Sequence, residues 1–170
     1  MKKFSLGFLL CISLTVVAQK DIAPTESFTI EGLVIQSKTI SLSDLSAYTV
    51  KQKDSVIITN HLLERKSVLM NVKGVLLKDI LATLKLKEEN PKLFSEFYFV
   101  CIAADNYKVV FSWNELFNTE TGNNAIIITE QNGKQATEAP NRIALISYGD
   151  KATGRRYVKS LQKILVERVK

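Results

Sequence analysis

A single stretch of this chain has the apolar period of an α-helix, and that scarcity of helix constrains the fold most. Apolar residues at positions 76, 77, 80, 81 and 84 recur every three to four residues, which predicts a helix that Pro91 prevents from extending. Most of the remaining chain consists of short segments rich in β-branched or apolar residues. The segments predicted as strands are 27–35, 54–59, 67–72, 97–103, 107–111, 125–129, 142–148 and 157–169. Six or more strands with one clear helix predict an α+β domain and not a regular βαβ series.

Several local patterns refine this prediction. Residues 38–45 are predicted as a turn and a short helical piece that Ser43 and Asp44 could cap, and 113–117 as a helical turn. The continuous apolar run 97–103 is typical of a strand buried on both faces. Asp105 and Asn106 have turn chemistry between two β-rich segments, which predicts a hairpin there.

Residues 1–18 have the organisation of a secretory signal peptide. Lys2 and Lys3 precede an apolar run that ends at Ala18, the one residue of the closing Val16-Val17-Ala18 stretch that satisfies the small-residue rule for cleavage. A transmembrane anchor is the alternative, but the run is short for a span of about 20 residues and is interrupted by Gly7. We therefore expect residues 19–170 to form a single domain that is exported to the periplasm or secreted. Contact with a membrane is expected only through the signal segment.

Charge and cysteine content narrow the function classes further. The formal net charge is +6 and falls to +4 when Lys2 and Lys3 are removed with the leader. Nucleic acid is not expected as a partner, because no basic stripe carries interleaved aromatic residues. Cys101 is the only thiol left in residues 19–170, and its uniformly apolar surroundings predict a buried core residue.

Few residues of this chain are candidates for catalysis or ligand binding. His61 is the only histidine and has no Cys or His partner for a metal site. The chain has no G-x-S-x-G, P-loop or G-x-G-x-x-G motif, and the spacing of Cys101 and His61 does not favour a thiol–imidazole pair. The segment 154–159, GRRYVK, stands out, because Arg156 and Lys159 could clasp a phosphate. A solvated basic turn leading into a strand explains the same residues equally well.

The order of these segments resembles the molybdopterin-binding domain of the sulfite oxidase family. Four motifs carry the resemblance and together cover nearly all of residues 19–170. They are FTIEGLVIQSKTISLSDL (28–45), KGVLLKDILATL (73–84), VCIAADNYKVV (100–110) with Asn106 where the family has glycine, and GDKATGRRYVKSLQKILV (149–166).

The resemblance implies a compact, β-rich α+β fold with a mixed sheet, and a molybdopterin or related pterin as a possible cofactor. Arg156 and Lys159 match the closing basic positions that lie near the pterin phosphate in the family. Asn60 and His61 follow the strand after which the family has its molybdenum-binding cysteine. No Cys occurs between Gln19 and Val100. The expected cofactor-binding residues are thus Arg156, Lys159, Asn60 and His61, with no metal ligand and no catalytic residue.

Loss of that cysteine would remove the protein's only bond to molybdenum, so we do not expect molybdenum to be held. The favoured function is an exported, non-catalytic module that binds a pterin-like or other anionic small molecule, or a protein partner. The alternative is a molybdenum cofactor-dependent oxidoreductase, or a subunit of one, with an atypical metal site. A third interpretation keeps the fold without any pocket.

Overall fold

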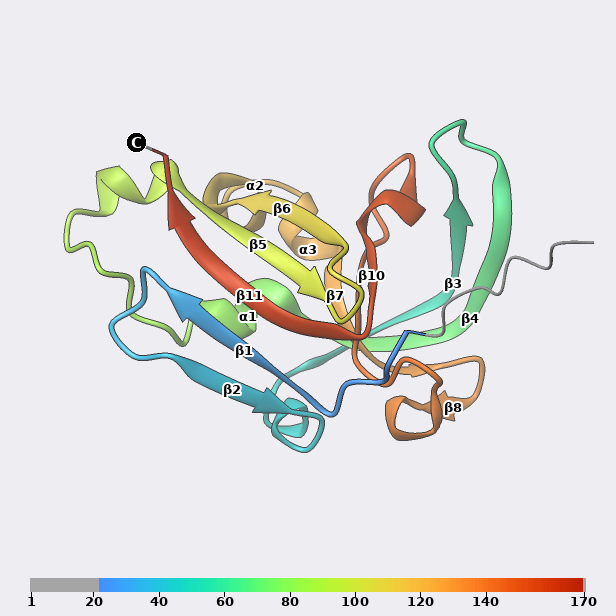
Figure 1. Ribbon diagram of the computed structural model, residues 1–170. Helices are drawn as coiled ribbons and strands as arrows, with labels where there is room; N and C mark the ends of the chain where they lie inside the picture. The colour runs from blue at the N-terminus through green and yellow to red at the C-terminus, as the bar shows by residue number, and fades with distance from the viewer. Residues whose placement is uncertain (1–21, 170) are drawn as a thin grey trace, which may run out of the picture.

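The computed structural model describes residues 22–169, so the predicted leader at 1–18 lies outside the described residues. Two β-sheets make up most of this part of the chain (Figure 1). The five-stranded sheet has the order β2 (Lys38–Ser41), β1 (Ser27–Gly32), β11 (Leu161–Arg168), β5 (Phe97–Ala103) and β6 (Lys108–Ser112). In this sheet β1 is parallel to β11 and the other pairs are antiparallel, so the sheet is mixed.

The six-stranded sheet ends at β3, whose other edge has no neighbouring strand among the described residues. Its order is β10 (Tyr157–Lys159), β9 (Ala144–Ser147), β7 (Ala125–Gln131), β4 (Arg65–Leu76) and β3 (Val50–Thr59), and β8 (Lys134–Gln135) pairs with β7. The helices are α1 (Leu77–Leu81), α2 (Trp113–Phe117) and α3 (Thr121–Asn124), with 3₁₀ turns η1 (Asp44–Ala47), η2 (Pro91–Glu96), η3 (Ala136–Glu138) and η4 (Thr153–Arg156). These short helices beside two extended sheets confirm the predicted β-rich α+β class.

Apolar side chains of both sheets form the core. The larger cluster centres on Phe28, Phe99, Phe111 and Ile164, which are at most 1% exposed. A smaller cluster lies under the β3–β4 hairpin and contains Val56 and Ile58, among others. In β5 the buried residues alternate with half-buried ones, so the prediction that both faces of this strand are buried was wrong. The alternation shows that one face of β5 packs on the core and the other is partly solvated.

Two further predictions need correction. The predicted helix at 76–84 is shorter, because Leu76 still belongs to β4 and α1 ends at Leu81, after which the chain continues in hydrogen-bonded turns. The segment 38–45 begins as strand β2, and only its last two residues, Asp44 and Leu45, belong to the helical turn η1. Pairing with β1 explains β2, since it places Ile40 opposite Phe28 in the core. The side chain of Ser43 makes no capping hydrogen bond.

The last predicted strand, 157–169, is two strands in different sheets. Ser160 separates them with a φ of 52°, which turns the chain from β10 into β11. The predicted hairpin is confirmed, because β5 and β6 pair in antiparallel register and Asn106 takes a left-handed φ of 70° between them. The helical turn α2 also forms as predicted, and Ser112 and Glu115 form a capping box at its N-terminus.

Candidate functional site

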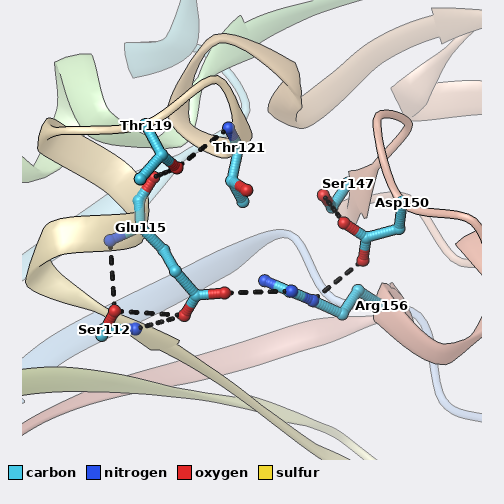
Figure 2. A network of polar contacts seen from close by, with 7 residues as sticks. All are labelled: Ser112, Glu115, Thr119, Thr121, Ser147, Asp150 and Arg156. Carbon is cyan, nitrogen blue, oxygen red and sulfur yellow. Dashed lines mark hydrogen bonds and ion pairs between the residues drawn. The ribbon is translucent and has the colours of Figure 1, made fainter.

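Arg156, the residue expected to hold a phosphate, is already bound to two carboxylates of the chain itself. Its Nε donates to Asp150 Oδ2 at 2.8 Å, and its Nη2 lies 3.0 Å from Glu115 Oε1 (Figure 2). The guanidinium carbon lies 4.7 Å from the centre of the Phe111 ring, so the planar group also packs on an aromatic face. These contacts leave the side chain 25% exposed.

Both carboxylates are in turn fixed by serine residues. Glu115 Oε2 accepts the Ser112 amide at 2.9 Å, and Asp150 Oδ1 accepts the Ser147 hydroxyl at 2.8 Å (Figure 2). Arg156 therefore ties α2 to the segment that joins β9 and η4. The third nitrogen of its guanidinium, Nη1, is buried and has no hydrogen-bond partner among the described residues.

Lys159 does not share these contacts. It is exposed on β10, and its Nζ lies 5.4 Å from the ring centre of Tyr157. Burial raises the pKa of the Tyr157 hydroxyl. Arg156 and Lys159 contact different residues, so the contacts do not join them in one clasp.

Asn60 shapes the turn between β3 and β4. Its Oδ1 accepts the amides of Leu62 at 2.9 Å and Glu64 at 3.0 Å, and its Nδ2 donates to Glu64 Oε2 at 2.8 Å. Lys66 also contacts that carboxylate, and the hydrogen bonds from Lys66 and Asn60 lower the pKa of Glu64. His61 is exposed in the same turn. The side-chain carboxamide of Asn60 therefore uses its oxygen and its nitrogen in hydrogen bonds within the turn.

The structure brings η4 against the end of β3, but it does so through other residues. The Thr59 amide donates to Thr153 Oγ1 at 2.9 Å, and Thr153 Oγ1 donates to the Ile57 carbonyl at 2.7 Å. A Cβ on Gly154 would lie 2.5 Å from the Thr59 carbonyl oxygen, so glycine permits this close approach between backbones.

A cavity of about 370 Å³ lies beside this contact, lined by Lys53, Ser55, Tyr148 and Lys151, among others. None of Asn60, His61, Arg156 and Lys159 lines it or any of the other four cavities described for residues 22–169.

The one thiol within residues 22–169 lies in the core. Cys101 is fully buried in β5, as predicted, and desolvation raises the pKa of its thiol to about 12. Among residues 22–169 no group of three or more His, Cys, Asp or Glu side chains is placed to hold a metal ion.

The residues at Arg156 do not fit the phosphate of a molybdopterin. A phosphate there would face the carboxylates of Glu115 and Asp150 and would have to displace at least one of them from the guanidinium. The same position would lack a thiolate, because Cys101 is in the core of the other sheet.

Comparison with known proteins reveals a shared fold. No protein-family model matches the chain, and no curated protein matches it. Among solved structures, the crystal structure of the sulfane dehydrogenase SoxCD from Paracoccus pantotrophus aligns with a TM-score of 0.59 at 13% identity. The alignment covers 84% of this chain and 39% of that chain, so this chain spans well under half of the length of its neighbour. The likeness supports the distant fold relationship that the sequence motifs suggest, and it is a likeness of fold alone.

Sequence reasoning missed three residues of this region: Leu62, Leu63 and Thr153. The leucines are 65% and 56% exposed at the end of the β3–β4 hairpin. Two consecutive leucines inside the polar stretch NHLLERK, between two predicted strands, were an available signal. Thr153 gave none, because its partner Thr59 is 94 residues away in the sequence. Separately, no helix within residues 22–169 is long and apolar enough to cross a membrane.

Proposed function

We propose that this chain is an exported, non-catalytic binding module on a scaffold related to that of the sulfite oxidase family, and that its partner is anionic. One observation carries the proposal: Arg156 is neutralised internally by Glu115 and Asp150. A cation that is already paired with two carboxylates contributes little to the binding of another anion. In this proposal an internal ion-pair network therefore replaces the pterin site of the scaffold.

Other cations remain available for an anionic partner. Lys53, Arg65, Lys151 and Arg155 are exposed and form no ion pair among the described residues. They lie on or beside the β3–β4 hairpin and the segment that leads into η4. This arrangement favours recognition of negative charge on the outside of the fold by cations other than Arg156.

The second candidate is a molybdenum cofactor-dependent oxidoreductase, or a subunit of one. The fold likeness to a sulfane dehydrogenase favours it. Against it stand the pairing of Arg156 and the core position of the only thiol in residues 22–169. If that cofactor were bound, it would supply oxo-transfer chemistry that the side chains around Arg156 cannot supply.

The deciding experiment measures molybdenum and pterin in the protein after export from a host that makes molybdenum cofactor. Elemental analysis and the fluorescence of oxidised pterin should both give only background signal. The variant Arg156→Met serves as the control, since it should give the same background. Near-stoichiometric molybdenum would overturn the proposal in favour of the oxidoreductase, whereas pterin without molybdenum would keep a non-catalytic module and contradict only the replacement of its pterin site.

A further inference from the structure

The turn of the β3–β4 hairpin presents two leucines to solvent at a projecting point of the molecule. Leu62 and Leu63 are 65% and 56% exposed. Figure 1 shows the hairpin standing away from the body, with the chain between β9 and β10 projecting beside it on the same side. The Thr59–Thr153 hydrogen bonds join the two projections. We call Leu62, Leu63 and the exposed cations at the base of their turn the apolar-basic tip.

The backbone of this tip is held in a conformation that leucine disfavours. Leu63 has a φ of 64°, in the left-handed region where Gly or Asn is normally found. The Asn60 side chain enforces it by accepting two amides of the turn, and the Leu63 amide donates to the Asn60 carbonyl at 3.1 Å. Strain of this kind at an exposed apolar residue points to a function for the side chain outside the fold.

Cations lie at the base of the hairpin turn. Arg65 and Lys66 open β4 one residue after the turn acid Glu64, and Lys151 comes from the neighbouring projection, where its carbonyl accepts the Thr59 hydroxyl at 2.8 Å. The acid in the turn, Glu64, is neutralised by Lys66. The tip therefore combines an apolar end with unpaired positive charge at its base.

We infer that the apolar-basic tip docks on an anionic membrane surface, with Leu62 and Leu63 inserted at the headgroup level and Arg65 and Lys151 contacting lipid phosphates. The inference rests on the proposed function, because it names the anionic partner. Apolar side chains at a convex end, with cations behind them, match a bilayer interface, where apolar burial and attraction to anionic lipid act together.

A protein partner fits this surface less well. Stable protein interfaces bury about 1,200–2,000 Å² in total, and two leucines at a convex turn offer only a small part of that area. A second copy of the chain would bring the same unpaired cations to the contact, which opposes self-association through the tip.

The test is co-sedimentation of the exported protein with vesicles. One set of vesicles contains phosphatidylcholine alone, and the other contains equal parts of phosphatidylcholine and phosphatidylglycerol. The protein should bind the anionic vesicles, bind the neutral ones much more weakly, and lose affinity as salt is added.

Leu62→Ser with Leu63→Asn keeps a residue suited to the left-handed turn and should weaken binding on the order of tenfold or more. Arg65→Gln with Lys151→Gln should weaken it by about fivefold for each charge.

Matched controls come from β6, which belongs to the other sheet. Val110→Thr and Lys108→Gln change an exposed apolar residue and an exposed lysine there, and both should bind as the unchanged protein does. Thermal melting of each variant checks that it is folded. Absence of binding to anionic vesicles, or equal binding by the double leucine variant and the unchanged protein, would overturn the inference.

The proposed function fails separately. Near-stoichiometric molybdenum in the purified protein would contradict the non-catalytic module without affecting the vesicle measurement. Protein that is free of molybdenum and does not bind anionic vesicles would contradict only the docking of the tip.

Discussion

Thr153 holds its side-chain oxygen 2.9 Å from the amide nitrogen of Thr59, at the outer edge of β3. The same hydroxyl donates to the Ile57 carbonyl at 2.7 Å, so one side chain satisfies a donor and an acceptor that a neighbouring strand would otherwise pair. Because β3 is the last strand of its sheet, this contact protects part of an edge that would otherwise offer its backbone to other chains.

Removing this hydroxyl should be costly. Thr153 is 5% exposed, so Thr153→Val keeps the shape and leaves the Thr59 amide and the Ile57 carbonyl without their partner. We expect the free energy of unfolding to fall by about 1–3 kcal/mol, measured by urea denaturation. The control is Thr39→Val, because Thr39 is the exposed residue of β2 and its side chain makes no hydrogen bond among the described residues, so the change should be within about 0.5 kcal/mol. Equal stability of the two variants would show that solvent replaces the Thr153 contacts.

Arg156 should behave as a structural residue. Arg156→Met leaves Glu115 and Asp150 without their shared cation, and we expect a loss of about 1–3 kcal/mol in the free energy of unfolding, since the group is only partly buried. Lys159→Met, an exposed change on β10, should cost less than about 0.5 kcal/mol. If Arg156→Met is as stable as Lys159→Met, the ion-pair network does not support the fold, and the guanidinium is free for a ligand.

The strands that the sequence predicts well are those whose pattern is local. β5, β6 and β7 follow from runs of β-branched and aromatic residues, and the Asp105–Asn106 turn follows from residues suited to positive φ. The predictions failed where tertiary contacts decide. β2 forms because it pairs with β1. The predicted strand 157–169 is interrupted at Ser160 because the chain passes there from one sheet to the other. No residue preference announces either event.

The candidate site was predictable only in part. The sequence singled out Arg156 by its motif, but its two carboxylates come from α2 and from the loop after β9, which only the fold brings together. The exposed leucines were predictable, because two consecutive apolar residues stand in an otherwise polar turn between two predicted strands. The positive φ of Leu63 could not, because leucine itself disfavours it.

Leu63 should limit the stability of the turn. Leu63→Asn places a residue that tolerates the left-handed region at a φ of 64°, so the free energy of unfolding should rise by about 1 kcal/mol. Leu62→Asn is the matched control, because Leu62 is also exposed but has no positive φ, and it should change stability by less than about 0.5 kcal/mol. Thermal and urea unfolding measure both. A stability of Leu63→Asn at or below that of Leu62→Asn would show that the turn stores no strain.

Cys101 should make the protein less stable at alkaline pH. Burial raises the pKa of its thiol from a usual value near 9 to about 12, so the folded chain keeps the proton while the unfolded chain releases it above about pH 9. The unfolded state then binds fewer protons than the folded state, and stability falls as pH rises from about 9 to about 12.

The expected slope is about 1.4 kcal/mol per pH unit relative to Cys101→Ala, which lacks the titrating group. Burial also raises the pKa of Tyr157, but this residue is common to both proteins and its contribution cancels in the difference. Urea unfolding at intervals between pH 8 and pH 11 measures the slope, and parallel curves for the two proteins would mean that the thiol is accessible enough to ionise in the folded state.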